Sequence, residues 1–199
     1  MNFLAHALLA GDGPEDRLGG LIGDFVKGPL PAGLPPAVAA GVRLHRQIDV
    51  FADAHPIFLR SRGRISAARR RVSGVMVDMF YDHFLARHWT SFHPDPLERF
   101  TSRAYRLLAD NAAILPPAMG RILPHMKAAD WLASYRSVEA VGAALDRMSA
   151  RLKRTDMLEG SGDELVREYA AFERDFFAFL PEAERYAARC RAARISEWE

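Results

Sequence analysis

Apolar residues recur along the chain at intervals of three and four positions, and no alternating pattern of useful length interrupts them. This spacing places the apolar side chains on one face of an α-helix and is not typical of a β-strand. The sequence therefore predicts an all-α fold, with prolines such as Pro181 separating the helices. The expected helices cover residues 2–10, 15–25, 35–53, 55–67, 72–92, 96–114, 117–126, 129–135, 138–151, 162–179 and 182–195.

Several predicted helices have recognisable starting residues. Pro35-Pro36 suits a first helical turn, because proline has the φ angle of a helix and needs no hydrogen-bond partner there. Asp95-Pro96 predicts an N-cap followed by a helix, and Ser137 is a second candidate cap. The chain shows no internal repeat and no low-complexity linker. We therefore expect one domain over residues 1–199, built as a helical bundle.

Composition narrows the class of protein further. Of the 199 residues, 49% are hydrophobic and 26% are charged, which is typical of a globular protein and argues against disorder. The single cysteine, Cys190, excludes an internal disulfide and a cysteine-built zinc site. The apolar stretch at residues 1–10 lacks a basic region and is too short to span a bilayer. We expect a cytoplasmic protein that does not enter a membrane.

Acidic and histidine residues interrupt the apolar sequence in three stretches. Asp24 follows an apolar turn among glycines, where a carboxylate is costly unless a partner compensates its charge. His45 and Asp49 are four positions apart, so on a helix their Cβ atoms lie about 5–6 Å apart on one face. Such a pair taken alone is more often a hydrogen bond on a helix surface. Asp24 taken alone could be a helix-end residue.

The third stretch places two carboxylates four positions apart on an apolar helix. Asp78 and Asp82 would repel each other there, and a divalent cation would reverse that penalty. His83 follows directly, although it points about 140° away from Asp78, so one of the two would flank the metal or support it indirectly. His6, in an apolar N-terminal segment, could supply another nitrogen. This mixed nitrogen and oxygen set suits Mn, Fe, Mg or Zn, while a solvated helix face is the alternative interpretation.

Arginines form a second pattern in the first half of the chain. No Asp or Glu occurs from Ala54 through Val77. Such a run is often a solvated face, but its one-sided charge also suits an acidic partner. No motif for reading nucleic-acid grooves accompanies it, so we do not expect a nucleic-acid partner. The cations in this stretch are Arg60, Arg62, Arg64, Arg69, Arg70 and Arg71.

Taken together, these segments resemble the acyl carrier protein phosphodiesterases, a family that is a divergent relative of the HD-domain phosphohydrolases. The combination of motifs is specific, and it covers about the first 90 residues. The stretches that support the resemblance are Met1-Asn2-Phe3-Leu4-Ala5-His6, Gly23-Asp24-Phe25-Val26-Lys27-Gly28, His45-Arg46-Gln47-Ile48-Asp49, Asp78 and Asp82-His83-Phe84-Leu85-Ala86-Arg87-His88-Trp89.

The resemblance implies an HD-domain-like helical fold, a divalent metal and hydrolysis of the phosphodiester that joins phosphopantetheine to the serine of acyl carrier protein. Mn²⁺ or Mg²⁺ is the expected ion, with Fe²⁺ as a further candidate. The HD relatives order their motif as His then Asp, whereas this chain has Asp82-His83. By position, the implied metal ligands are Asp24, Asp78, Asp82 and His83, with His6, His45 and Asp49 as additional candidates.

Catalytic roles follow from the same resemblance. Asp24 or His83 could orient or deprotonate the attacking water. Lys27 and Arg46 could neutralise the charge that develops on the phosphoryl group. Acyl carrier proteins are strongly acidic, so the arginines between residues 60 and 71 would steer the carrier towards the enzyme.

Two other functions are compatible with the residues. A metal-dependent enzyme of this kind could act on a nucleotide or another small phosphate ester. A non-enzymatic helical binding module could use the same acids only to cap and solvate its helices. The sequence leaves the oligomeric state open.

Overall fold

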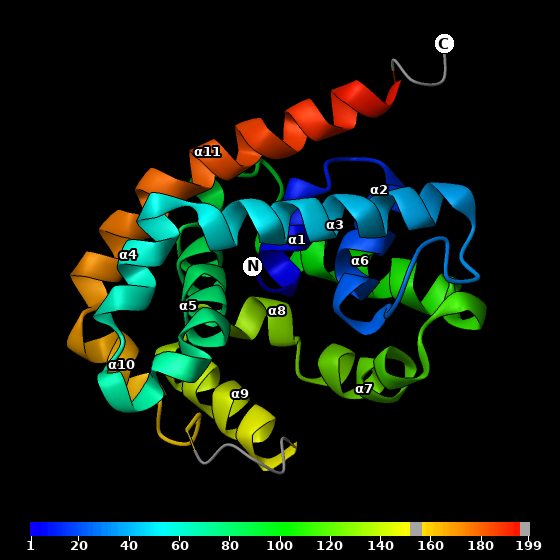
Figure 1. Ribbon diagram of the computed structural model, residues 1–199. Helices are drawn as coiled ribbons and strands as arrows, with labels where there is room; N and C mark the ends of the chain where they lie inside the picture. The colour runs from blue at the N-terminus through cyan, green and yellow to red at the C-terminus, as the bar shows by residue number, and fades with distance from the viewer. Residues whose placement is uncertain (152–156, 196–199) are drawn as a thin grey trace.

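The computed structural model describes residues 1–151 and 157–195, and within those ranges the chain forms helices and no strand (Figure 1). The all-α prediction is therefore confirmed for the described residues. Four short 3₁₀ segments, η1–η4, lie between the α-helices. The elements are α1 (Phe3–Leu9), α2 (Pro14–Ile22), η1 (Gly23–Phe25), α3 (Pro36–Ala54), α4 (Pro56–Arg64), η2 (Ala67–Val72), α5 (Ser73–Arg87), η3 (Trp89–Ser91), α6 (Leu97–Asp110), η4 (Ala112–Ile114), α7 (Pro117–Ala128), α8 (Trp131–Ser134), α9 (Val138–Arg151), α10 (Gly162–Arg167) and α11 (Tyr169–Ile195).

The predicted helix starts are correct in two places and wrong in one. Helix α3 has Pro36 in its first turn, and the Ser137 hydroxyl accepts a hydrogen bond of 3.3 Å from the Ala140 amide at the start of α9. Asp95 does not cap α6. Its carboxylate instead accepts a hydrogen bond of 2.7 Å from Arg103, and Pro96 precedes the first helical residue.

The C-terminal region differs from the prediction of two helices over 162–179 and 182–195. Helix α10 is a short separate element, and α11 then continues as one helix through Pro181. Proline removes one backbone hydrogen bond but does not prevent a helix whose side chains are held by other contacts. Leu180 and Ala183, on either side of Pro181, are buried in the core. Packing along this face therefore keeps the helix continuous.

One hydrophobic core joins the helices, and α5 lies in its middle (Figure 1). Helix α5 buries side chains on most sides, as expected of a helix surrounded by others. Of the aromatic residues of α11, Phe172, Phe176 and Phe179 are fully buried, whereas Phe177 is partly exposed. Among the described residues, no helix has both the length and the apolar character that crossing a membrane requires.

The crossing of α2 and α3 is unusually close. A Cβ atom on Gly19 would overlap the backbone of Gly41, so the two helices can approach to this distance only because both residues lack side chains. Helix α2 leads directly into η1, which contains Asp24, while α3 contains His45 and Asp49. The close crossing therefore brings two of the three acidic stretches together.

Candidate metal centre

His6, His45 and Asp49 form a compact cluster between α1 and α3. Each residue offers one potential ligand atom, and these atoms all lie within 4.8 Å of one another. The His6 Nε2 atom is 3.0 Å from Asp49 Oδ1, and the His45 Nε2 atom is 3.2 Å from Asp49 Oδ2. The two imidazole rings stack with their centroids 3.7 Å apart. One carboxylate thus faces two histidines, each on a different oxygen.

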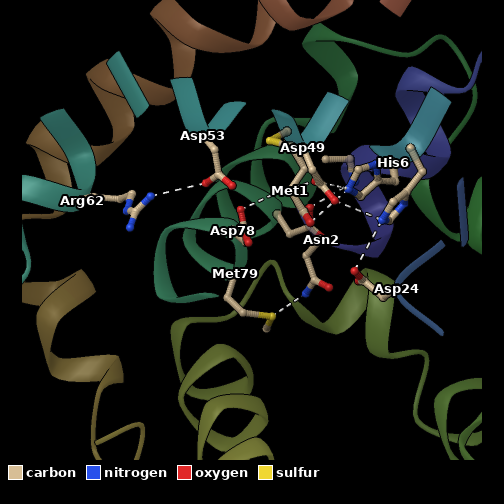
Figure 2. Close-up of polar contacts among 12 residues, drawn as sticks. Met1, Asn2, His6, Asp24, Asp49, Asp53, Arg62, Asp78 and Met79 are labelled. Atoms are coloured by element: carbon tan, nitrogen blue, oxygen red, sulfur yellow. Dashed lines mark hydrogen bonds and ion pairs between the residues drawn. The ribbon is translucent and has the colours of Figure 1, made fainter. Parts of the chain in front are cut away.

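Two further carboxylates flank this cluster, and Figure 2 shows Asp24 and Asp78 on opposite sides of it. Asp24 Oδ1 is 3.4 Å from His45 Nε2, and its side chain is 54% exposed. Asp78 Oδ1 lies 2.7 Å from the α-amino nitrogen of Met1, which is also 3.3 Å from Asp49 Oδ1. A positive group is therefore already held between two of the carboxylates. The sequence offered no signal for this contact of Met1.

Asp82 determines where the first helix begins. Its carboxylate accepts hydrogen bonds of 2.8 and 3.0 Å from the amides of Leu4 and Ala5, which have no partner within α1. Burial raises the pKa of Asp82 to about 7, although these two hydrogen bonds act in the opposite direction. No described contact joins Asp82 to the His6 ring. Asp82 therefore positions the cluster through the backbone of α1.

The orientation of His45 depends on two residues outside the cluster. Its Nδ1 atom donates to the carbonyl oxygen of Gly20 at 2.9 Å, which leaves Nε2 directed at Asp24 and Asp49. Histidines that bind metals are commonly held by such a bond from the other ring nitrogen. A Cβ atom on Gly23 would overlap the His45 ring, so only glycine fits there. The glycines noted beside Asp24 in the sequence thus make room for this imidazole.

The protonation states of the histidines differ. Burial and the neighbouring charge of His45 lower the pKa of His6 to about 4. Burial also acts to lower the pKa of His45, but its hydrogen bonds with Asp24 and Asp49 outweigh this and raise the pKa to about 9. Burial acts to raise the pKa of Asp49, but its hydrogen bonds with His45 and His6 outweigh this and lower the pKa below its usual range. Burial raises the pKa of Asp78, partly offset by the ammonium of Met1.

The donor set of the cluster fits a divalent cation. His6 Nδ1 is buried and has no hydrogen-bond partner among the described residues, whereas buried polar atoms are nearly always paired. Two imidazoles and a carboxylate suit manganese, iron, zinc or, with more oxygen ligands, magnesium. Asp24 and Asp78 lie beside the cluster and could supply further oxygens. The compact cluster thus consists of the three residues that were predicted from the sequence as additional candidates, and the metal itself stays a prediction.

His83 lies outside this group of residues. Its Nδ1 atom is 2.8 Å from the carbonyl oxygen of Tyr135, and its Nε2 atom is 2.9 Å from the hydroxyl of Tyr169. Burial lowers its pKa. The helical rotation that separates His83 from Asp78 therefore sends the two side chains to different neighbours. The predicted roles of His83 and Asp82 as ligands have no supporting contact.

Arg46 and Lys27, the two cations that were predicted to act in catalysis, differ in their hydrogen-bond partners. Arg46 donates a hydrogen bond of 2.9 Å to the carbonyl oxygen of Val26, and so holds the segment that follows η1. Lys27 is exposed, and no described acid pairs with it. Arg46 therefore fixes the backbone two residues after Asp24, while Lys27 presents its charge at the surface.

Most of the arginine run is neutralised by acids of the same chain. Arg60 and Arg64 donate to Asp175, and Arg69 lies 3.4 Å from Glu164. Arg62 lies 3.4 Å from the exposed carboxylate of Asp53. The two remaining members, Arg70 and Arg71, are exposed and have no acidic partner among the described residues.

Comparison with known proteins gives a consistent result. A sequence model of the family described as acyl carrier protein phosphodiesterase matches residues 1–183. A protein named acyl carrier protein phosphodiesterase from Escherichia coli O157:H7 (strain EC4115 / EHEC) is 35% identical over 190 residues, which is 95% of this chain and 98% of the relative. A protein of the same name from Salmonella agona (strain SL483) is 36% identical over the same share of each chain. No solved structure matches this chain.

Proposed function

Because the chain belongs to the acyl carrier protein phosphodiesterase family, we propose that it hydrolyses the phosphodiester that links 4′-phosphopantetheine to the serine of holo-acyl carrier protein. The products are apo-acyl carrier protein and 4′-phosphopantetheine, and the reaction takes place in the cytoplasm. One observation carries the proposal: His6 of α1 and the pair His45 and Asp49 of α3, which come from two separate stretches of the chain, lie within 4.8 Å of one another.

We propose that the reaction depends on a divalent metal, with Mn²⁺ or Mg²⁺ expected and Fe²⁺ a further candidate. His6, His45 and Asp49 would hold it, and Asp24 and Asp78 are the additional oxygen donors. When bound, such an ion polarises a phosphoryl oxygen and lowers the pKa of bound water towards about 7. The hydrogen bond from His45 to Gly20 supports this role, because it presents Nε2 to the cluster.

The chain's own residues supply the remaining chemistry. Asp24 is half exposed and ionised, since its hydrogen bond with His45 outweighs partial burial and lowers its pKa. It is therefore available to accept a proton from the attacking water. Lys27, three positions later, neutralises negative charge on the phosphoryl oxygens. Arg46 keeps this segment in place through the Val26 carbonyl.

The carrier's approach is the second part of the proposal. Arg70 and Arg71 keep their charges unpaired at the surface, and two such cations attract an acidic protein over about one Debye length. Arg60, Arg62, Arg64 and Arg69 contribute less to this attraction, because acids of the same chain balance them.

Mass spectrometry of the carrier tests this function directly. Holo-carrier incubated with the protein and Mn²⁺ should lose the mass of phosphopantetheine and gain that of water. The same reaction should stop after chelation and resume on adding Mn²⁺ or Mg²⁺. A carrier that keeps its mass would refute the activity, and full turnover in excess chelator after dialysis would refute the dependence on metal.

A further inference from the structure

One cavity is lined by Phe3 and Phe25, which are close in sequence to the ligand candidates His6 and Asp24. Its volume is about 550 Å³, within the usual range for sites that bind small molecules. Helices α7, α8 and α9 form most of its wall, and Phe3 and Phe25 complete it. Trp131 and Met148 also face the cavity, so most of its lining is apolar.

Two phenylalanines connect this cavity to the chain segments that contain the ligand candidates. Phe25 directly follows Asp24 in η1, and Phe3 lies in the first turn of α1, one turn before His6. The two rings stack with their centroids 6.0 Å apart. They form an aromatic part of the cavity wall on the two segments that also contain Asp24 and His6. A molecule whose reacting group lies at the cluster could therefore extend along this wall.

The cavity also contains cations without acidic partners. Arg121 and Arg147 line it and are exposed, and no described acid pairs with either. Arg147 lies over the Trp131 ring, 5.3 Å from its centroid. No Asp or Glu occurs from Ala112 through Ala129, a span that includes all of α7. Guanidinium groups on an apolar wall offer several hydrogen-bond donors and no acceptor.

We propose that this cavity binds the pantetheine arm of the substrate, an inference that rests on the proposed function. The arm is uncharged, and it contains a geminal dimethyl group, a secondary hydroxyl, two amides and a terminal thiol. Its methyl groups match the wall of Phe3, Phe25 and Trp131, and its amide carbonyls accept hydrogen bonds from Arg121 and Arg147. The phosphodiester then lies at the cluster, with the carrier serine on the outer side.

Binding of free pantetheine tests the cavity without any catalysis. Ligand-observed NMR in the presence of chelator should detect binding to the wild type. Ala118 is partly buried in the cavity wall, and Ala118→Phe places a ring in the cavity, so it should weaken binding about tenfold or more. Arg147→Gln, at an exposed site, should weaken it several-fold without affecting folding. Undetectable binding to the wild type, or equal binding to Ala118→Phe, would overturn the inference.

A matched control uses the same substitution elsewhere. Ala37 is exposed at the start of α3 and lines a separate groove of about 720 Å³ with Asp16 and Arg191. Ala37→Phe should leave pantetheine binding unchanged. Thermal melting of each variant establishes that it is folded. Pantetheine binding reduced equally by both substitutions would count against the cavity.

Turnover measurements separate this inference from the proposed function. With holo-carrier, Ala118→Phe should lower kcat/KM about tenfold through KM, while hydrolysis of bis(p-nitrophenyl) phosphate, which has no arm, should not change. Cleavage of holo-carrier without pantetheine binding would refute the cavity alone. Pantetheine binding without cleavage would refute the proposed function and leave the cavity as a pantetheine site.

Discussion

Two groups of charged side chains lie at the core's edge, one around Asp49 and one around Asp175. Asp175 is 2% exposed and accepts hydrogen bonds from Arg60, Arg64 and Ser61. Asp49 is 34% exposed, and its main partners are two imidazoles. Both carboxylates are ionised, because hydrogen bonds outweigh the effect of burial and lower the pKa of each.

The difference lies in what surrounds the carboxylates. Arginine stays charged at any physiological pH and cannot coordinate a metal, so the Asp175 group is complete as it stands. Imidazoles can exchange a proton for a metal ion, and His6 Nδ1 has no hydrogen-bond partner among the described residues. A concentration of charge alone therefore does not identify a site. A better indication of a site is a group that can exchange its proton for a metal ion and that lacks a hydrogen-bond partner.

The largest expected effect comes from removing the charge of Asp49. Asp49→Asn keeps the shape of the side chain but should lower kcat/KM for holo-carrier about a thousandfold, because a bound metal contributes several kcal/mol to catalysis. Its melting temperature should fall as well, because Asp49 pairs with the buried Met1 ammonium and with His45, so activity is compared per folded molecule. Asp53→Asn, one turn later on α3, is the matched control and should keep full activity. Activity of Asp49→Asn within tenfold of the wild type would contradict a role in catalysis.

Removing the charge of Asp175 should lower stability without lowering activity. Asp175→Asn should lower the free energy of unfolding by about 1–3 kcal/mol, because it leaves arginine donors without their buried acceptor. Activity per folded molecule should not change. Urea denaturation and kcat/KM measure the two quantities. Glu168→Gln, which changes an exposed acid 3.8 Å from Arg64, should cost less than about 1 kcal/mol.

The loss of stability caused by Asp175→Asn should also depend on pH, and it should be smaller in acid. Burial acts to raise the pKa of Asp175, but hydrogen bonds from Arg60, Arg64 and Ser61 outweigh it and lower this pKa in the folded state. The group therefore stabilises the fold above the ordinary Asp pKa, and this contribution is lost as pH falls through the lower folded value. The difference in stability between wild type and Asp175→Asn should shrink in acid. A constant difference down to about pH 2 would show that Asp175 is not the cause.

The smallest effect should come from the unpaired surface arginines. The double variant Arg70→Glu/Arg71→Glu should lower kcat/KM for holo-carrier several-fold at low salt, and the difference should fade at high salt. Hydrolysis of bis(p-nitrophenyl) phosphate is the internal control and should stay constant. An effect that is independent of salt would point to a change in structure rather than steering.

Local spacing predicted that His45 and Asp49 share one helix face, although it gave them only as additional ligand candidates. His45 and Asp49 are neighbours on one helix, so their four-residue separation alone brings them together. The roles of Asp82 and His83 could not be derived in this way. Asp82 bonds to Leu4, 78 positions away, and His83 contacts Tyr169, 86 positions away. The rotation of the helix places Asp82 and His83 on different faces of α5. Only the tertiary packing determines which residues contact each face.

The cavity wall was missed for a different reason. The recognised motifs cover about the first 90 residues, whereas α7 and α9 follow them. The absence of acids from Ala112 through Ala129 was a visible signal of the same kind as the arginine run. The arginine run drew attention because of its density, yet internal acids neutralise most of it. Charge pattern in a sequence therefore needs its tertiary partners before it can indicate a surface.

The glycine that touches His45 has a consequence for how variants of this protein should be selected. Gly23 has no functional group, yet any side chain at this position would enter the volume of the imidazole. A library restricted to ionisable residues would overlook it, although replacing it should be as harmful as replacing a ligand. Engineering that aims to retain the chemistry must therefore also keep glycine at position 23, so that the His45 ring has room.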